Sequence, residues 1–101
     1  LVFSDLEAAS TCILFRNMLP VGVFSYHQEG QDAEILIDFM IPEYRDFKAG
    51  RFLYRTKRMF FKERGIKRFH AVARHPSHPK YYLKNGFTED PDVVGGFVCE
   101  L

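Results

Sequence analysis

An anion-binding turn is predicted at residues 41–50, whose sequence is IPEYRDFKAG. The apolar, strand-like run ILIDFMI leads into it, and a basic, helix-like segment follows from residue 51. Where a strand turns abruptly into a helix, the N–H groups of the first helical turn lack intrahelical partners, and the helix dipole favours an anion beside them. The turn therefore predicts a phosphate or pyrophosphate site, although a turn that binds nothing is also compatible with these residues.

Two carboxylates of the strand-like region are candidates for a general base. Side chains alternate between the faces of a regular strand, so Glu34, Leu36, Asp38 and Met40 are predicted to share one face. Asp38 interrupts an apolar run that is predicted to be buried on both faces. A buried carboxylate needs partners and acquires a raised pKa, which suits a base. Glu34 is either the alternative base or a solvated acid at a strand edge.

A tyrosine near the start of a short predicted helix is a further candidate. Tyr82 stands four residues before Gly86 and Phe87 in the stretch YYLKNGF. It is either an aromatic anchor for the helix or a phenol that takes part in chemistry. By contrast, His70, His75 and His78 have no cysteine or carboxylate at ligand spacing, so the sequence predicts no metal site.

The pattern of apolar residues predicts the elements that would position these groups. Strands are predicted at 11–16, 21–27 and 33–41, which together form an antiparallel meander. A helix follows at 49–64, a strand at 66–73, a short helix at 78–84, and final strand material at Phe87 and 96–101. The strand–helix–strand unit requires the third and fourth strands to be parallel. The fold class is therefore α/β, with a mixed sheet that is mostly antiparallel.

The helix at 49–64 is predicted to be amphipathic and to end at Gly65. Tyr54 and Phe61 are predicted on its flank. Its predicted apolar face consists of Phe52, Leu53, Met59 and Phe60. The opposite face carries a basic stripe of Arg51, Arg55, Arg58 and Lys62.

Together, FMIPEYRDFKAGRFL and YLKNGF resemble the two signature motifs of the GNAT superfamily of N-acetyltransferases. The motifs lie one helix and one strand apart, as in that family, and the resemblance covers roughly residues 20–87. It implies a GNAT-like mixed sheet that lacks most of the family's usual N-terminal strand and helices. Two residues depart from the family pattern: Lys48 stands where the first loop glycine is usual, and His75 where an asparagine often stands.

The resemblance implies acetyl-CoA as the cofactor. The N–H groups of residues 47–51 would hold the pyrophosphate, and backbone groups of residues 39–41, left free where the strands splay apart, would pair with the pantetheine arm. Tyr82 would protonate the departing thiolate, and Glu34 falls where histone acetyltransferase members carry their glutamate base. The implied cofactor-binding residues are Phe39, Met40, Ile41, Arg45, Asp46, Phe47, Lys48, Ala49, Gly50 and Arg51.

The charges of the chain are strongly segregated. Residues 45–84 hold thirteen of its fourteen Lys and Arg but only two acids. Such a block indicates an anionic partner. Nucleic acid is disfavoured, because the sequence has neither the aromatic strand motif of RNA readers nor a recognition-helix pattern. No run of residues is long and apolar enough to predict a membrane span.

The 101 residues fit one domain, which we predict to be a piece of a longer parent protein. Cys12 and Cys99 are predicted to be small buried hydrophobes, which favours a reducing, cytoplasmic location. The predicted function is transfer of an acetyl group from acetyl-CoA to an unidentified primary amine. The alternative is a non-catalytic module that binds CoA or a protein. Contact with a second copy or with the rest of the parent protein is left open.

Overall fold

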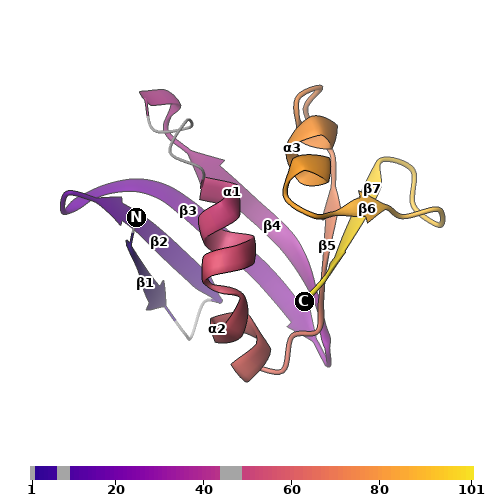
Figure 1. Cartoon of the computed structure of the whole chain (residues 1–101), viewed down its shortest axis with the longest axis horizontal. Helices are drawn as coiled ribbons and strands as arrows, with labels where there is room; N and C mark the ends of the chain where they lie inside the picture. The colour runs from indigo at the N-terminus through magenta and orange to yellow at the C-terminus, as the bar shows by residue number, and fades with distance from the viewer. Residues whose placement is uncertain (1, 7–9, 44–48) are drawn as a thin grey trace.

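The computed structural model describes residues 2–6, 10–43 and 49–101, and these form one seven-stranded sheet with helices packed on it. The strand order is β1-β2-β3-β4-β5-β7-β6, and Figure 1 shows one long helical segment crossing in front of the strands. The predicted mixed α/β sheet is confirmed. The elements are β1 (Val2–Leu6), β2 (Thr11–Arg16), β3 (Leu19–Glu29), β4 (Asp32–Met40), α1 (Ala49–Arg51), the π-helical turn η3 (Phe52–Thr56), α2 (Arg58–Glu63), β5 (Arg68–Val72), α3 (His78–Lys84), β6 (Thr88–Glu89) and β7 (Gly96–Glu100).

Tight turns build the meander of β1 to β4. Asn17 and Met18, the two residues between β2 and β3, both have positive φ, at 50° and 67°. This is the conformation of a type I′ turn, whose twist matches that of the flanking strands. Gly30, with φ of 62°, closes the next hairpin. Strand β1, which the sequence analysis did not predict, pairs antiparallel with β2.

The parallel pair β4–β5 separates soon after it forms. The pairing is parallel, as predicted, but it covers only residues 32–34 of β4 and 68–70 of β5. Beyond that point β4 continues beside β3 as far as Met40, whereas β5 continues beside β7. Figure 1 shows the two strands diverging from their shared end. The divergence opens the sheet next to the start of the helical segment.

A β-bulge in β4 changes which of its side chains face the helices. The register between β3 and β4 shifts at Leu36, which has no directly opposite residue. Ile35 before the bulge and Met40 after it are both buried, although residues five apart lie on opposite faces of a regular strand. The bulge therefore turns Asp38 to the helix side and leaves Glu34 on the other side. The prediction that Glu34, Leu36, Asp38 and Met40 share one face is wrong.

A π-helical turn interrupts the predicted long helix. In η3 the N–H of Lys57 donates to the carbonyl of Phe52, five residues back, at 2.9 Å. The extra residue shifts the buried face, so that Tyr54 and Phe61 are buried while Met59 is 61% exposed. Placing Met59 on the apolar face, and Tyr54 and Phe61 on the flank, was therefore wrong. The exposed stripe of Arg51, Arg55, Arg58 and Lys62 is confirmed.

An aromatic cluster fills the core between the sheet and the helical segment. Phe24 of β3 and Phe69 of β5 meet Phe61 of α2, with ring centroids 5.6 Å and 5.1 Å from that of Phe61. Such tilted and edge-on contacts are the preferred geometry of buried aromatic pairs. Cys12 and Cys99 are both buried in the core, which confirms their prediction as small buried hydrophobes.

Candidate functional site

A cavity of about 600 Å³ lies between the end of β4, the start of the helical segment and α3. Its volume suits a small-molecule or cofactor ligand. Arg51, Arg55 and Lys84 give it a cationic rim, and Asp38 supplies a carboxylate. The other lining residues are Phe39, Met40, Gly50, His75, Ser77, His78, Tyr81, Tyr82 and Asn85.

Asp38 is held by two tyrosine hydroxyls. Tyr54, in η3, donates to Asp38 Oδ2 at 2.6 Å, and Tyr81, in α3, donates to the same oxygen at 2.9 Å. Burial raises the pKa of Asp38 above its ordinary value, although the two hydrogen bonds and the nearby His78 act in the opposite direction. Within the described part of the chain, Oδ1 has no hydrogen-bond partner, so it is available to accept a proton.

Tyr82 places a phenol at the wall of the same cavity. The residue is only 4% exposed, and its ring packs on Phe87 and Phe97 with centroids 5.1 Å and 5.4 Å away. No side-chain oxygen or nitrogen of the described residues is both buried and unpaired. The Tyr82 hydroxyl, for which they offer no hydrogen bond, is therefore reached from the cavity. Burial, followed by the charge of Asp38, raises the pKa of Tyr82 to about 12, so the hydroxyl stays protonated at neutral pH.

Two histidines, His75 and His78, line the same cavity as Asp38. The backbone N–H of Arg74 donates to Nδ1 of His78 at 3.2 Å, and the N–H of Ser77 donates to Nδ1 of His75 at 3.2 Å. The two imidazole rings lie 5.8 Å apart. Because Nδ1 of each ring accepts a hydrogen bond from a backbone N–H, Nε2 carries the proton when the ring is neutral.

Gly50 brings the helical segment close to the end of α3. A Cβ added at Gly50 would clash with the side-chain amide of Asn85. That amide donates from Nδ2 to the carbonyl of Tyr81 at 2.8 Å. Gly50, assigned from the sequence to the phosphate loop, thus also has a packing role. It allows two walls of the cavity to approach one another.

The structure describes only part of the predicted cofactor-binding set. Arg45, Asp46, Phe47 and Lys48 lie outside the described residues. Phe39, Met40, Gly50 and Arg51 line the cavity, and α1 begins at Ala49. Ile41 differs from its prediction, because its N–H is not free: it donates to the carbonyl of Val21 in β3 at 2.9 Å.

Glu34 is not brought together with Asp38 or Tyr82. It is exposed on the opposite face of the sheet, where it is paired in register with His27 of β3 and His70 of β5. There it lines a second cavity of about 360 Å³ with both histidines. The two predicted candidates for the base therefore face different cavities.

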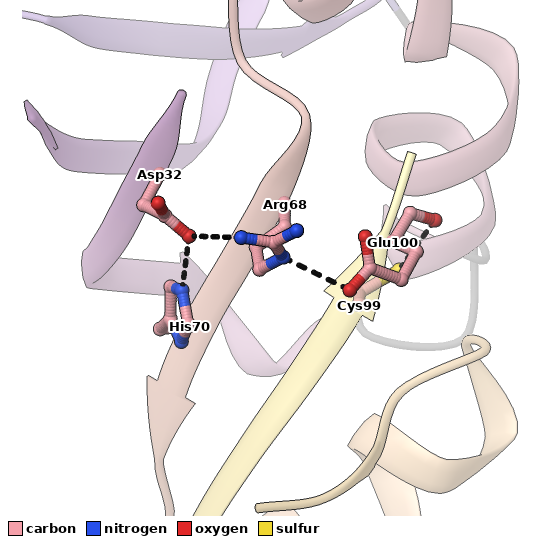
Figure 2. Close-up of polar contacts among 5 residues, drawn as sticks. All are labelled: Asp32, Arg68, His70, Cys99 and Glu100. Carbon is pink, nitrogen blue, oxygen red and sulfur yellow. Dashed lines mark hydrogen bonds and ion pairs between the residues drawn. The ribbon is translucent and has the colours of Figure 1, made fainter. Parts of the chain in front are cut away.

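An ion-pair network joins side chains of β4, β5 and β7 (Figure 2). Asp32 Oδ1 lies 2.7 Å from Nε2 of His70 and 3.1 Å from Nη1 of Arg68. Arg68 also donates from Nε to Glu100 at 2.9 Å. These contacts join β4, β5 and β7 at the end of the sheet where β4 and β5 are paired, before the two strands diverge.

Tyr54 and Tyr81 are site residues that the sequence analysis did not select. The sequence indicated only that a buried Asp38 would need hydrogen-bond partners. It could not indicate which residues these are, because the bulge in β4 and the π-helical turn bring the partners to Asp38. Tyr81 also stands beside Tyr82, and the motif spacing that singles out Tyr82 gives no role to Tyr81.

The sequence matches no protein-family model and no curated protein. The structure, however, is similar to solved acetyltransferases. It aligns with the PaiA N-acetyltransferase of Thermoplasma acidophilum, crystallised with coenzyme A, at a TM-score of 0.77 and 22% identity, covering 90% of this chain and 60% of that one. A GNAT-family acetyltransferase of Staphylococcus aureus gives a TM-score of 0.75 at 20% identity, with 90% and 66% covered.

N-acetylglutamate synthase of Neisseria gonorrhoeae, complexed with coenzyme A and N-acetyl-glutamate, gives a TM-score of 0.74 at 18% identity. That alignment covers 95% of this chain and 27% of the synthase. The chain therefore spans less than two thirds of the length of the first of these proteins, and about a quarter of the synthase. The three alignments nevertheless cover 90–95% of this chain. The chain therefore has the fold of the GNAT acetyltransferases.

Proposed function

We propose that this chain binds acetyl-CoA in the cavity between β4, the helical segment and α3, and transfers the acetyl group to a primary amine. The observation that carries the proposal is the meeting of Asp38 and Tyr82 in one cavity with a cationic rim. A carboxylate with a raised pKa suits proton abstraction, and a protonated phenol suits donation to a leaving group. The acceptor amine is unidentified.

The residues present fit the proposed cofactor. Arg51, Arg55 and Lys84 line the cavity and are exposed, so they can meet phosphate groups from solvent. Residues 45–48 and the N–H groups of residues 47–51 remain the predicted pyrophosphate site. Met40 and Phe39, at the divergent end of β4, remain the predicted neighbours of the pantetheine arm.

Asp38 is the base that the geometry favours. Acetyl-CoA, when bound, supplies a thioester whose carbonyl carbon an amine can attack. Asp38 would take the proton that the amine loses, through Oδ1, while Tyr54 and Tyr81 hold Oδ2. Glu34 remains the alternative, but its position on the other face of the sheet weakens the case for it. Tyr82 would donate its hydroxyl hydrogen toward the departing sulfur.

A non-catalytic interaction module is the alternative function, and one observation favours it. Leu36, Ile37 and Phe39 of β4 are 46%, 49% and 47% exposed, so the strand is not buried on both faces as predicted. Exposed apolar side chains of this kind mark contact surfaces when they are contiguous. A cytoplasmic location remains a prediction. Of the helices in the described residues, none combines the length and apolar character that a membrane crossing requires.

Calorimetric titration with CoA tests the proposal directly. We expect a dissociation constant of roughly micromolar order, about −8 kcal/mol. Amide chemical-shift changes should appear at Gly50 and Arg51. Acetyl-CoA should then be consumed in the presence of a panel of small amines and peptides. Binding without consumption would favour the non-catalytic alternative, and an absence of binding at millimolar CoA would remove the proposal.

A further inference from the structure

His78 and Tyr82 form a pair on one face of α3. They stand four residues apart in the helix, a spacing that places side chains one above the other. Their rings meet edge-on, with centroids 5.7 Å apart, and both residues line the 600 Å³ cavity. A group in the cavity that reaches Tyr82 therefore lies beside His78 as well.

The hydrogen bond to Nδ1 fixes what His78 can do. Because the N–H of Arg74 occupies Nδ1, the neutral ring carries its proton on Nε2. Burial, His75 and Arg74 lower the pKa of His78, and the charge of Asp38 only partly opposes them. Within the described ranges no group hydrogen-bonds to Nε2. His78 is thus a neutral donor at neutral pH, and it cannot act as a base without losing its bond to Arg74.

The departing sulfur of CoA needs a second hydrogen-bond donor, because Tyr82 does not readily give up its proton. With the pKa of Tyr82 raised to about 12, the phenol is a weaker acid than an alkyl thiol, so full proton transfer from tyrosine to thiolate is unfavourable. The sulfur then departs as a thiolate that must be stabilised by hydrogen bonds. Tyr82 supplies one such bond.

We propose that His78 supplies the other, by donating Nε2–H to the departing sulfur beside the Tyr82 hydroxyl. The inference rests on the proposed acetyl transfer. In that step the amine nitrogen forms the new C–N bond, and Asp38 takes the proton that it loses. The sulfur keeps the electron pair of the broken C–S bond, and His78 and Tyr82 each donate a hydrogen bond to it. Both donors stay neutral, so the helix presents two hydrogen bonds to one developing charge.

The test measures the thiol of bound CoA rather than turnover. CoA carrying ¹³C beside the sulfur is bound to the unmutated chain, and its carbon shift is followed against pH. We expect the bound thiol to titrate at lower pH than free CoA. His78→Phe should raise that titration point by about one pH unit, a tenfold change, whereas His78→Gln, which keeps an N–H donor, should retain most of the effect. Leu83→Ala, exposed on the same helix and outside the cavity, is the matched control.

Binding of desulfo-CoA, which lacks the sulfur, separates the possible failures. Equal affinity for desulfo-CoA in all variants shows that they are folded and that the cavity is intact. If His78→Phe then leaves the thiol titration where the unmutated chain has it, the role of His78 is overturned and the proposed function stands. If the unmutated chain binds neither CoA nor desulfo-CoA, both proposals fail together.

Discussion

Asp38 accepts two hydroxyl hydrogen bonds on one carboxylate oxygen, and this arrangement sets how it can act. Tyr54 and Tyr81 approach from η3 and from α3, so the carboxylate also joins two helical elements to β4. The shared oxygen is satisfied, which directs proton chemistry to the other oxygen. At the scale of single residues, the site therefore consists of a fixed carboxylate and a hydroxyl, that of Tyr82, open to the cavity.

Tyr82→Phe should lower turnover about 10²–10⁴-fold, the usual contribution of a positioned acid or donor. The ring contacts with Phe87 and Phe97 are kept, so CoA affinity should hardly change. Steady-state rates with any amine that the chain acetylates, together with calorimetry, check both expectations. Full turnover in the variant would rule out a role for the hydroxyl.

Asp38→Asn should make the free energy of unfolding less dependent on pH. The native pKa of Asp38 is raised above the ordinary 3.8, so the native state binds this proton more tightly than the unfolded chain does. The resulting stabilisation is complete below about pH 3.8 and is lost as pH rises through the native pKa, at up to about 1.4 kcal/mol per pH unit. As pH rises through the native pKa of Asp38, the free energy of unfolding of the variant should therefore rise relative to that of the unmutated chain.

Denaturant titrations at a series of pH values provide the measurement, and Asp32→Asn is the control with the opposite sign. The pKa of Asp32 is lowered, first by its hydrogen bond with His70, so its contribution is present above the ordinary pKa and is lost as pH falls. Parallel pH curves for the Asp38 variant and the unmutated chain would contradict the assignment of a raised pKa to Asp38.

At the scale of elements, the site depends on three departures from regular structure. The bulge at Leu36 turns Asp38 inward, and the π-helical turn brings Tyr54 to it. The close approach of Gly50 to Asn85 then sets the distance between the helical segment and α3. Bulges and π turns are frequent at functional sites, where they redirect a side chain.

Gly50→Ala should lower the free energy of unfolding by about 1–2 kcal/mol, because the new methyl group displaces the Asn85 side chain. The displaced amide would also lose its hydrogen bond to the Tyr81 carbonyl. In an Asn85→Ala background the same change should be neutral or stabilising, since alanine is the better helix former. A double-mutant cycle measures the difference. Equal effects in both backgrounds would show that Gly50 and Asn85 are not coupled.

At the scale of the whole molecule, only part of the basic block borders the cavity. The helical segment and α3 carry most of the basic residues that the structure describes in this block, and Arg51, Arg55 and Lys84 line the cavity. A positive field of this kind raises the rate at which anions associate, and salt weakens it. Basic residues that line the cavity are expected to contact the anionic ligand, whereas basic residues elsewhere in the block only add to the field that attracts it.

Replacing Arg51 and Arg55 together by Gln should weaken CoA binding at least tenfold and flatten its salt dependence. Arg58→Gln with Lys62→Gln removes the same net charge from the same stripe, but neither residue lines the cavity. This control pair should change affinity much less. Calorimetry across a range of salt concentrations checks both. Equal losses in the two pairs would mean that only the overall field attracts the ligand.

The sequence by itself determined the order of strands and helices from residue 11 to residue 84, the parallel pair, the exposed basic stripe and the resemblance to the GNAT fold. These follow from local periodicity, turn residues and motif spacing, which short segments encode on their own. Gly65 ends the helical segment with φ of 83°, as predicted from glycine alone.

Only the tertiary structure decided which side chains meet. A single inserted residue reverses the facing of a strand and rotates the buried face of a helix, and the sequence marks neither insertion. The bulge separated Glu34 from Asp38, and the π turn moved Tyr54 and Phe61 into the core. Distances between Asp38, Tyr81 and His78 depend on how β4, η3 and α3 pack together, because residues far apart in the chain come into contact only through the fold.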